Sequence, residues 1–473
     1  MPTLKLKRNT VAGNSPTTAQ LVVGELALNT EDGYLYAENN AGTVVNRIGT
    51  TSERVRYLPA GTGAVATTVQ GKLRESVSVK DFGAVGDGTT NDSAAFQACI
   101  DSLPMGGRIY VPTGNYRILT TLNLHSGLSF YGDSCVNNVF GTPTYNEQSS
   151  HIFLDADAGK LFTIPANTQI ESIYFTDLSF SARLNPTIVP RGTVTGFHFE
   201  GEAPYGMKHF GFTRCEFSNF GGYAIRVYDP TGGTGIDWNS NPGYMDECTF
   251  YYNTIGIEFD TDNADYWRLT GVGFIGAAGS FGIMCRRVGT LVLNQCGGGG
   301  GTMIAYIGAA RDSLTLICCQ FEAGDYMIHL NDTMATLQTY MPITLISCVV
   351  ESPILLNKPC HLISQGTRWV NNLEVTASGV VVDMLFDSFL SSTAINLAAG
   401  SYVKNFLTHG SDLPIGVAGT ILDGYRHSGP RIAGASPIGV TAPLYIGEEY
   451  YDNVAGIWYK GSGTTVNAWA QLN

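Results

Sequence analysis

Between residues 207 and 356 the hydrophobic positions recur in blocks of one shape. Each block has an apolar residue, two variable residues, a small apolar residue and, two positions later, usually another apolar residue. The small residues are Cys215, Cys248, Val272, Cys296, Cys319 and Cys348, with spacings of 33, 24, 24, 23 and 29 residues. A run of alternating apolar and polar residues follows each block, which indicates a short strand. Short strands recurring at such a period predict a solenoid.

Stacking of the blocks decides which side chains face the core. Equivalent residues of successive coils lie roughly 4.8 Å apart, so columns of side chains run along the inside and the outside of the stack. The Cys column is predicted to lie inside as small hydrophobic side chains, because the cysteines do not form the paired spacing of a zinc site. We therefore expect neither a metal nor a cofactor.

The first fifty residues have the pattern of a separate module. Residues 21–29 and 34–36 are apolar runs around an Asp-Gly turn, and a third strand is expected over residues 44–48. A sheet this small buries too little surface to be stable alone, which predicts partner chains. Residues 20–36 resemble the small N-terminal modules of bacteriophage tail fibres and tailspikes. The resemblance implies attachment to a virion baseplate or tail protein.

Residues 77–118 carry the most specific local motif. The run Val77-Ser-Val-Lys-Asp-Phe-Gly-Ala-Val-Gly-Asp-Gly88 precedes a segment with helical apolar spacing at residues 94–100, and strands are expected from Gly106 onward. This run resembles the entry segment of the pectate-lyase-like superfamily of right-handed parallel β-helices, which includes phage tailspikes. The resemblance implies a short helix that covers the open end of the β-helix and protects its hydrophobic edge.

The solenoid pattern fades after residue 375, and a further small module follows. Residues 445–452 and 456–459 are predicted to pair as a hairpin, with a last strand at Trp469. The module resembles short C-terminal modules of phage fibre proteins, which implies trimerisation or contact with carbohydrate. The predicted organisation is a β module at 1–50, a linker or neck at 51–75, a β-helix at 76–428 and a C-terminal β module at 429–473.

The predicted fold class is therefore all-β, a single-stranded right-handed parallel β-helix with small β modules at both ends, and the resemblance implies a homotrimer. Gly makes up 57 of the 473 residues and charged residues only 14%, which suits tight turns between short strands. The net charge of −13 argues against nucleic acid or an anionic membrane as partner, since phosphates need Lys and Arg. Without a signal peptide or an apolar spanning run, the protein is expected to be made in the host cytoplasm.

Two groups of acidic residues could carry chemistry on the outside of the stack. The first lies on the second and third regular coils, where the pairing of strands places Glu258 outward beside Arg226. Its candidate acids are Glu258, Asp260, Asp262 and Asp237, and its candidate substrate-binding residues are Trp238, Tyr244, Tyr251, Tyr266, Trp267, Arg226 and Arg268. Aromatic rings in such a group can pack on the apolar faces of sugars. The alternative is a solvated loop of turn-forming Asp and a simple ion pair between Glu258 and Arg226.

The second group consists of Glu322 and Glu351, which occupy equivalent positions on successive coils. Gln320 and the glycine run 297–301 lie beside them, and five glycines leave a low surface that a polymer or a neighbouring subunit can approach closely. Carboxylates about 5 Å apart suit a retaining glycosidase, and wider pairs suit an inverting one. The alternative is a pair that points apart or lies in a subunit interface.

The resemblance to tailspikes implies a phage tail protein that binds and cleaves a bacterial surface polysaccharide, capsule or O-antigen, during adsorption to the host. Because two carboxylates are the machinery of glycoside hydrolysis, an endo-glycosidase is the expected activity. A polysaccharide lyase is one alternative, and it needs a cation to neutralise a uronate. The candidate cations are Arg226, Arg268, Arg286 and Arg287. A spike that binds glycan without cleaving it is the other alternative.

Overall fold

The computed structural model describes two compact units, Met1–Val77 and Ser78–Asn473, each of which is treated by itself. The described residues are 6–472 except 49–51, 54, 136–148, 165–168, 186–188, 202–206, 231–242, 262–265, 311–312, 323, 331–340, 391–392, 409–424, 428–430, 434–435, 439–448, 453–454, 456, 463–464 and 466. No helix among them is long and apolar enough to cross a membrane.

The first unit contains the predicted three-stranded antiparallel arrangement and one further strand. β2 (Leu26–Asn29), β3 (Tyr34–Glu38) and β4 (Val45–Ile48) pair in order, and β1 (Lys7–Asn9) adds to β2 in parallel. Its buried core consists of Leu21, Ala27 and Tyr36, with Val45 packed against them. Where the sequence predicted a linker, the chain forms β5 (Arg56–Tyr57), β6 (Thr67–Thr68) and α1 (Val69–Leu73).

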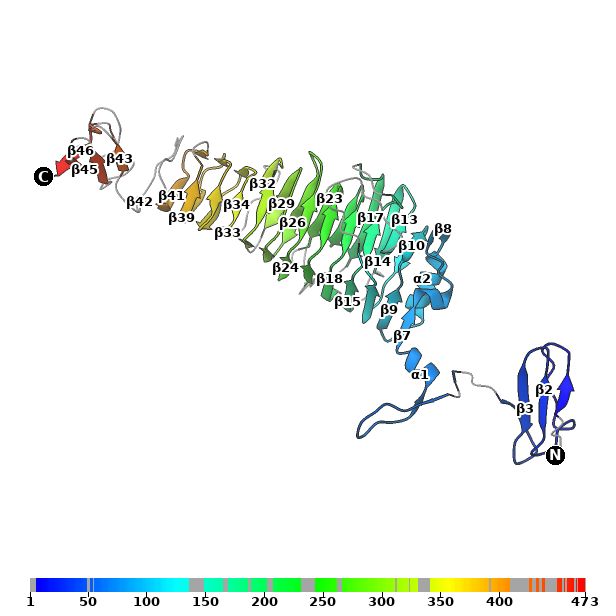
Figure 1. Ribbon diagram of the computed structural model, residues 1–473. Coiled ribbons are helices and arrows are strands. Elements are labelled where there is room, and N and C mark those ends of the chain that lie inside the picture. The colour runs from blue at the N-terminus through cyan, green and yellow to red at the C-terminus, as the bar shows by residue number, and fades with distance from the viewer. Residues whose placement is uncertain are drawn as a thin grey trace. The chain divides into compact units, whose positions relative to one another are not determined.

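The second unit begins with the predicted entry segment. After β7 (Ser76–Ser78), which crosses the boundary between the two units, the 3-10 helix η1 (Val79–Phe82) and β8 (Asp87–Asn91) lead into α2 (Ser93–Asp101), which lies at the N-terminal end of the stacked coils (Figure 1). α2 buries Phe96, Cys99 and Ile100 completely. The ring of Phe96 meets that of Tyr116 edge-on, at 5.3 Å between centroids. The helix therefore seals apolar surface of the first coil, as the entry motif predicted.

The coils form three parallel faces, joined strand to strand along the whole stack. The first face contains β9 (Gly107–Val111), β12 (Leu128–Gly132), β15 (Ile170–Thr176), β18 (Met207–Thr213), β21 (Gly243–Asp246), β24 (Trp267–Thr270), β27 (Leu291–Asn294), β30 (Leu314–Ile317), β33 (Met341–Ile346), β36 (Cys360–Gln365), β39 (Val381–Phe389), β41 (Tyr402–Thr408) and β42 (Tyr425–His427). The second contains β8, β10 (Gly114–Ile118), β13 (Ser150–Leu154), β16 (Ser179–Ser181), β19 (Glu216–Ser218), β22 (Thr249–Tyr251), β25 (Gly273–Ile275), β28 (Gly297–Gly299), β31 (Gln320–Glu322), β34 (Val349–Val350) and β37 (Arg368–Trp369).

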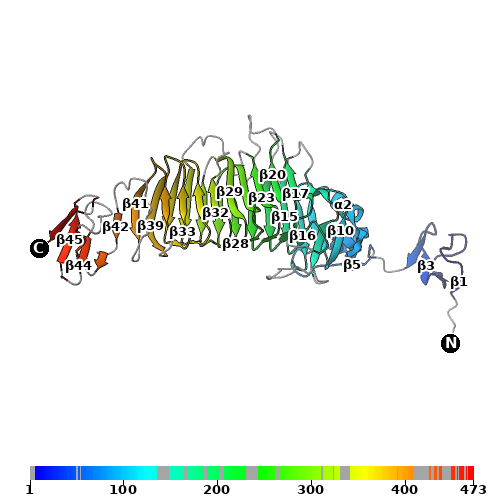
Figure 2. The same cartoon turned by 90° about the horizontal axis from the view of Figure 1, so that it is seen from above.

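The third face contains β11 (Leu122–Asn123), β14 (Ala158–Thr163), β17 (Thr193–Glu200), β20 (Tyr223–Tyr228), β23 (Ile255–Asp260), β26 (Phe281–Val288), β29 (Thr302–Ala310), β32 (Tyr326–Leu330), β35 (Ile354–Leu356), β38 (Leu373–Val375) and β40 (Ile395–Leu397). Its strands β17, β20, β23 and β29 follow one another along the stack in Figure 2, with β26 between the last two. Every strand pair of these three faces is parallel, so the predicted parallel β-helix is confirmed. Parallel crossovers are almost always right-handed, as predicted here.

The residue before each repeated Cys forms the corner between the first and second faces. That residue takes a left-handed conformation on coil after coil, at Asp177, Arg214, Glu247, Gly271, Gln295, Cys318 and Ser347. Its N–H donates to a carbonyl of the next coil, as from Gln295 to Ile317 at 2.8 Å. The turn reverses the inward and outward sense of the chain, so the following Cys or Val points into the core.

The predicted Cys column is buried as expected. Cys215, Cys248, Cys296, Cys319 and Cys348 are each at most 2% exposed. The Cys319 thiol donates to the Leu293 carbonyl of the preceding coil at 3.6 Å. A hydrogen bond with Cys296 raises the pKa of Cys319 to about 12, which keeps this thiol neutral at physiological pH.

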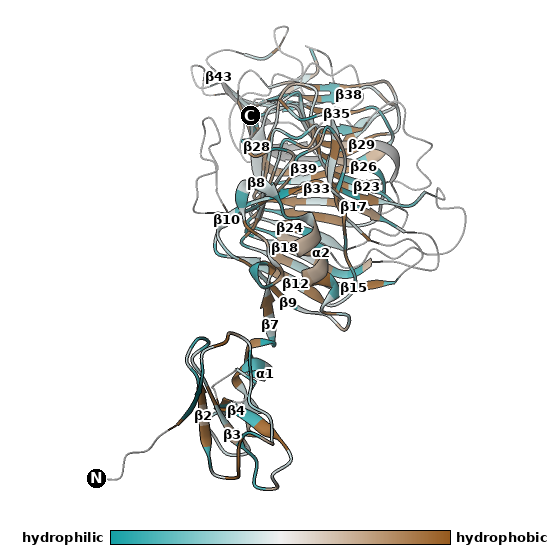
Figure 3. Ribbon diagram, turned by 90° about the vertical axis from the view of Figure 1, so that its right-hand side faces the viewer, coloured by the Kyte–Doolittle hydropathy of each residue, from teal (hydrophilic) through white to brown (hydrophobic). Residues whose placement is uncertain are grey.

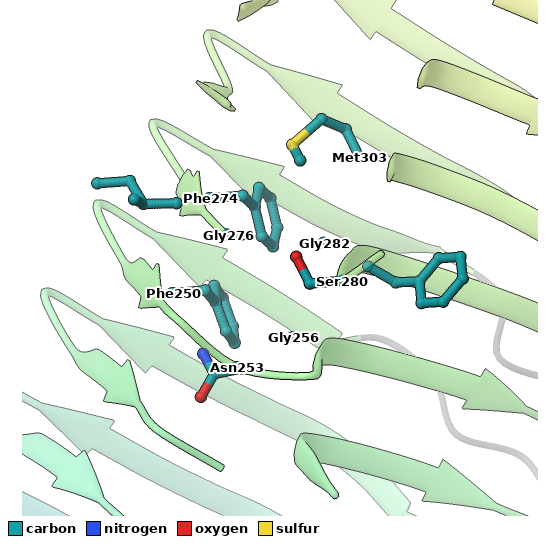
Figure 4. Close-up of a pocket in the computed structure, with 10 residues that line it drawn as sticks. Phe250, Asn253, Gly256, Phe274, Gly276, Ser280, Gly282 and Met303 are labelled. Carbon is teal, nitrogen blue, oxygen red and sulfur yellow. The ribbon is translucent and has the colours of Figure 1, made fainter. Parts of the chain in front are cut away.

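Aromatic rings fill the interior of the second face until a glycine replaces them. Phe180, Phe217, Phe250 and Phe274 stack on successive coils, with centroids 4.8 to 5.4 Å apart. The next position in register is Gly298, followed by Phe321. Figure 4 shows the rings of Phe250 and Phe274 beside a small cavity, which Asn253 and Ser280 also line. Hydrophobic residues on the strands are brown in the end-on view of Figure 3.

The strand pairing predicted near the C-terminus is confirmed. β44 (Glu449–Asp452) and β45 (Ile457–Gly461) form the expected antiparallel hairpin, β46 (Trp469–Leu472) follows, and β43 (Arg431–Ala433) adds in parallel. Its buried residues are Tyr450, Tyr459 and Trp469.

Gly298 offers a sharp test of the close approach between coils. A Cβ at this residue would lie 1.8 Å from the Phe274 carbonyl oxygen, whereas a Cβ at the neighbouring Gly273 would meet nothing closer than 3.9 Å. We predict that Gly298→Ala lowers the free energy of unfolding by more than about 3 kcal/mol, because main chain must move. Gly273→Ala should change it by less than about 1 kcal/mol. Denaturant midpoints followed by circular dichroism would compare them, and equal midpoints would contradict the packing described.

Candidate functional site

An open groove crosses four successive coils of the second face. It has a volume of about 760 Å³. Its lining residues are Tyr252, Ile275, Gly276, Gln295, Cys296, Gly297, Gly298, Gly299, Gly300, Cys318, Gln320 and Glu322. The second group of acids predicted from the sequence therefore lies at one end of a surface hollow.

The floor of the groove is main chain, because glycines occupy the outward positions of β28. A Cβ on Gly297 would lie 2.8 Å from the Gln320 carbonyl oxygen, and one on Gly299 would lie 2.4 Å from that of Glu322. Gly300 has a φ of 77°, a conformation that disfavours other residues. The predicted low surface over the glycine run is thus confirmed, and no other residue type could form it without moving the backbone.

The two predicted carboxylates meet through one amide. The Nε2 atom of Gln320 donates to Oε1 of Glu322 at 2.7 Å and to Oε1 of Glu351 at 3.1 Å. The two oxygens are therefore no further apart than the sum of these lengths, about 5.8 Å. Glu322 is exposed, and Glu351 is half-buried. The side chains converge instead of pointing apart, which was the alternative for this pair.

The convergence allows acid–base or nucleophilic chemistry without a metal. Two carboxyl groups about 5 to 5.5 Å apart are the arrangement of retaining glycosidases, in which one protonates the leaving oxygen and the other attacks the anomeric carbon. In the part of the chain that the structure describes, no group of three or more His, Cys, Asp and Glu side chains could hold a metal ion.

The first predicted group has a different environment, on the third face. Glu258 is 0% exposed, and its two oxygens accept from Arg226 at 2.5 Å and from Arg286 at 2.6 Å. The Arg226 guanidinium also lies over the rings of Tyr228 and Tyr223, at 3.9 and 4.7 Å from their centroids. The predicted neighbourhood of Glu258 and Arg226 is confirmed, but the carboxylate is buried, as in the ion-pair alternative.

Asp260 is held in a similar way. Its carboxylate accepts from Nε of Arg287 at 2.8 Å, and Arg287 also donates to the main-chain oxygens of Asp229 and Asp260. The remaining acids of this group, Asp237 and Asp262, lie outside the described residues, as does Trp238. The described acids of the first group thus serve as partners of arginines.

The predicted aromatic residues of the first group do not gather into one surface. Trp267 is 0% exposed, packs on Phe259 inside the core, and so cannot stack on a sugar. Tyr251, only 3% exposed, is likewise inaccessible. These two burials contradict the sequence prediction.

Tyr244 and Arg268 are exposed neighbours on the first face, where the Tyr244 ring lies over Gly211. Tyr266 is 69% exposed and precedes β24. None of these three residues is among those that line the groove.

The structure adds groove residues that the sequence prediction missed, above all Tyr252, Ile275, Gln295 and Cys318. Tyr252 and Cys318 both have positive φ, of 45° and 52°, because they occupy corners of the coil. A signal was present for Cys318, since it precedes the Cys319 of the repeat. Tyr252 is the residue after β22, and nothing in the repeat marks it as different from Tyr251.

Part of this chain is similar to known proteins. Residues 76–268 match the family model described as rhamnogalacturonase A/epimerase, pectate lyase-like. The chain is 37% identical over 76 residues to the tail spike protein of Shigella phage Sf6, which covers 15% of this chain and 12% of that protein. It is 54% identical over 43 residues to mannuronan C5-epimerase AlgE1 of Azotobacter vinelandii, covering 9% and 3%. The chain thus spans only a small part of the length of these relatives.

Among solved structures, a double mutant of the tailspike protein of E. coli bacteriophage HK620 aligns with 79% of this chain and 71% of its own, at 12% identity and a TM-score of 0.49. The family match thus covers residues 76–268, and the three parallel faces described above show that the chain has the fold of a parallel β-helix.

Proposed function

We propose that this protein is a phage tailspike that binds and cleaves a bacterial surface polysaccharide, capsule or O-antigen, by glycoside hydrolysis in the second-face groove. The observation that carries the proposal is the pair Glu322 and Glu351, bridged by Gln320 at the end of an open groove. The matches to a phage tail spike protein and to a pectate-lyase-like family model support the same class of substrate.

In this mechanism, one of the two carboxyl groups donates a proton to the glycosidic oxygen while the other attacks the anomeric carbon. Water then releases the sugar, assisted by the first group acting as a base. Gln320 is the positioning residue, because its amide holds both carboxyl groups at once. The glycine floor lets the polymer approach the main chain closely.

Lyase chemistry is less well supported by the described residues. Of its four candidate cations, Arg226 and Arg286 are engaged by Glu258, and Arg287 by Asp260. Arg268 is exposed, but it lies on the first face, away from the groove lining.

The proposal includes a homotrimer in the virion tail, attached to a baseplate or tail protein through residues 1–50. The first unit supports this role, because a core built from Leu21, Ala27 and Tyr36 is too small to stabilise the sheet strongly without partner chains.

Substitution of the two acids tests the chemistry directly. We predict that Glu322→Gln and Glu351→Gln each lower kcat about 10² to 10⁴-fold, because each removes a group that acts in the transition state. Purified protein would be incubated with polysaccharide from the host strain, and reducing ends and the absorbance of unsaturated uronate would be followed. Reducing ends alone indicate hydrolysis, and both signals indicate a lyase.

The matched control is Glu171→Gln, an exposed glutamate on the first face whose nearest cation, Lys208, is 3.9 Å away. It should keep full activity. If both groove variants retain wild-type cleavage, the assignment of the catalytic pair is wrong. If the wild type binds the polysaccharide without either signal, the protein is a non-catalytic spike.

Cys318 provides a test that needs no change to the acids. Among the described cysteines it is the exposed one, and it lines the groove, whereas the repeated Cys column is buried. We predict that alkylation with a bulky maleimide lowers cleavage at least about tenfold by blocking the polymer, and that bound polysaccharide slows the labelling. A Cys318→Ser variant should be active and insensitive to the reagent. Full activity of quantitatively labelled wild-type protein would place the site elsewhere.

Replacement of Glu258 distinguishes the two acid groups. The Glu258→Gln variant leaves Arg226 and Arg286 beside a neutral amide, so we predict a loss of about 3 kcal/mol in the free energy of unfolding. Folded protein at low temperature should still cleave, because this carboxylate is not accessible. A folded Glu258→Gln protein with no cleavage, alongside active Glu322→Gln, would move the catalytic site to the third face.

A further inference from the structure

The groove runs along the stack of coils instead of around one coil. Tyr252 follows β22, Ile275 ends β25, Gly299 ends β28 and Glu322 ends β31, so the lining comes from four successive coils. Three coil spacings of roughly 4.8 Å separate Tyr252 from Glu322, about 14 Å in all. A pyranose residue of an extended glycan is comparable in length to one coil spacing, so the groove matches a short glycan segment lying parallel to the axis.

Tyr252 occupies a corner whose backbone does not favour a tyrosine. The equivalent corner residues of the neighbouring coils are Asn219 and Gly276, and each donates its N–H to the next coil as Tyr252 does. Asn tolerates the left-handed conformation, but a bulky residue at φ 45° is uncommon. The ring is half-exposed and meets Tyr251 edge-on at 4.6 Å. A strained, supported aromatic ring at the rim of a groove points to a role outside folding.

The charge of the groove limits what can lie in it. Its described lining contains the acid Glu322, the amides of Gln295 and Gln320, and apolar or glycine surface, but no Lys, Arg or His. Glu351 adds a second carboxyl next to Glu322, and the chain as a whole carries −13. A uronate in this segment would lie near like charge without a described cation to offset it.

We infer that the groove binds an uncharged segment of glycan parallel to the β-helix axis, with Tyr252 stacked on the sugar about three coils from the bond that is cleaved. The inference rests on the proposed function and names its substrate class.

The test compares substitutions at two aromatic residues with positive φ. Tyr252→Asn copies the corner residue of the preceding coil, so it removes the ring and keeps the turn. We expect it to raise KM for the cleaved polysaccharide about tenfold, with kcat within about twofold. Tyr252→Phe should restore the wild-type KM. Phe386→Asn is the matched control, since Phe386 is 50% exposed at φ 60° and does not line the groove, and its KM should not change.

The second part of the test uses purified bacterial surface polysaccharides with and without uronates, and mass spectrometry of the products. We expect the three sugars on the Tyr252 side of each cleaved bond to be uncharged. An unchanged KM in Tyr252→Asn, or products with uronate in those positions, would overturn the inference while leaving the catalytic pair intact. Full activity of both Glu322→Gln and Glu351→Gln would instead show that the assignment of the catalytic pair is wrong. Failure of every polysaccharide to bind or be cleaved would overturn both.

Discussion

Main-chain hydrogen bonding between successive coils is the constraint on which the rest of this structure depends. Each strand pairs in parallel with the equivalent strand of the next coil, and the corner residues continue the pairing through their own N–H groups. Equivalent residues must therefore stay in register, so a side chain on one coil lies above the same position on another. The column of buried Cys, the stack of Phe rings and the outward pair of Glu322 and Glu351 are three consequences of this one rule.

The groove lies where glycines occupy the positions that are in register with larger residues on neighbouring coils. On the inside, Gly298 interrupts the stack of rings that ends at Phe274, and on the outside Gly297 and Gly299 leave the main chain bare. The coils pack so closely there that Cβ atoms would collide with carbonyl oxygens of neighbouring coils. A structural need for glycine and an accessible floor thus coincide, and the first coil with outward polar side chains beyond the floor carries Gln320 and Glu322.

The sequence could predict whatever depends on period and alternation. The register of the repeat correctly placed the inward Cys and Phe residues, the neighbourhood of Glu258 with Arg226, and the convergence of Glu322 with Glu351. The same register also shows that Trp267 was a wrong candidate for substrate binding. Trp267 is two positions before the repeated apolar residue Leu269, so its side chain points inward. Tyr251 was a wrong candidate for a different reason. It is an outward residue, and its burial depends on neighbours that alternation does not reveal.

The burial of Glu258 in the first acid group depends on a local irregularity of strand pairing that periodicity cannot predict. The pairing of β23 with β26 shifts by one residue after Phe259, which pairs with Cys285, while Asp260 pairs with Arg287. The extra residue is Arg286, and its guanidinium completes the enclosure of Glu258. Bulges of this kind redirect side chains by a single inserted residue. Periodicity could not predict the exposure of Tyr252 either, since that exposure depends on the small residues of later coils.

The most direct measurement of the central claim is a crystal structure of the Glu322→Gln variant with an oligosaccharide of the polysaccharide it binds. The account predicts sugar density over Gly297–Gly299, running along the β-helix axis from the ring of Tyr252 to the carboxyl of Glu351. Sugar bound on the third face beside Arg226 and Arg286, with the glycine groove empty, would contradict it.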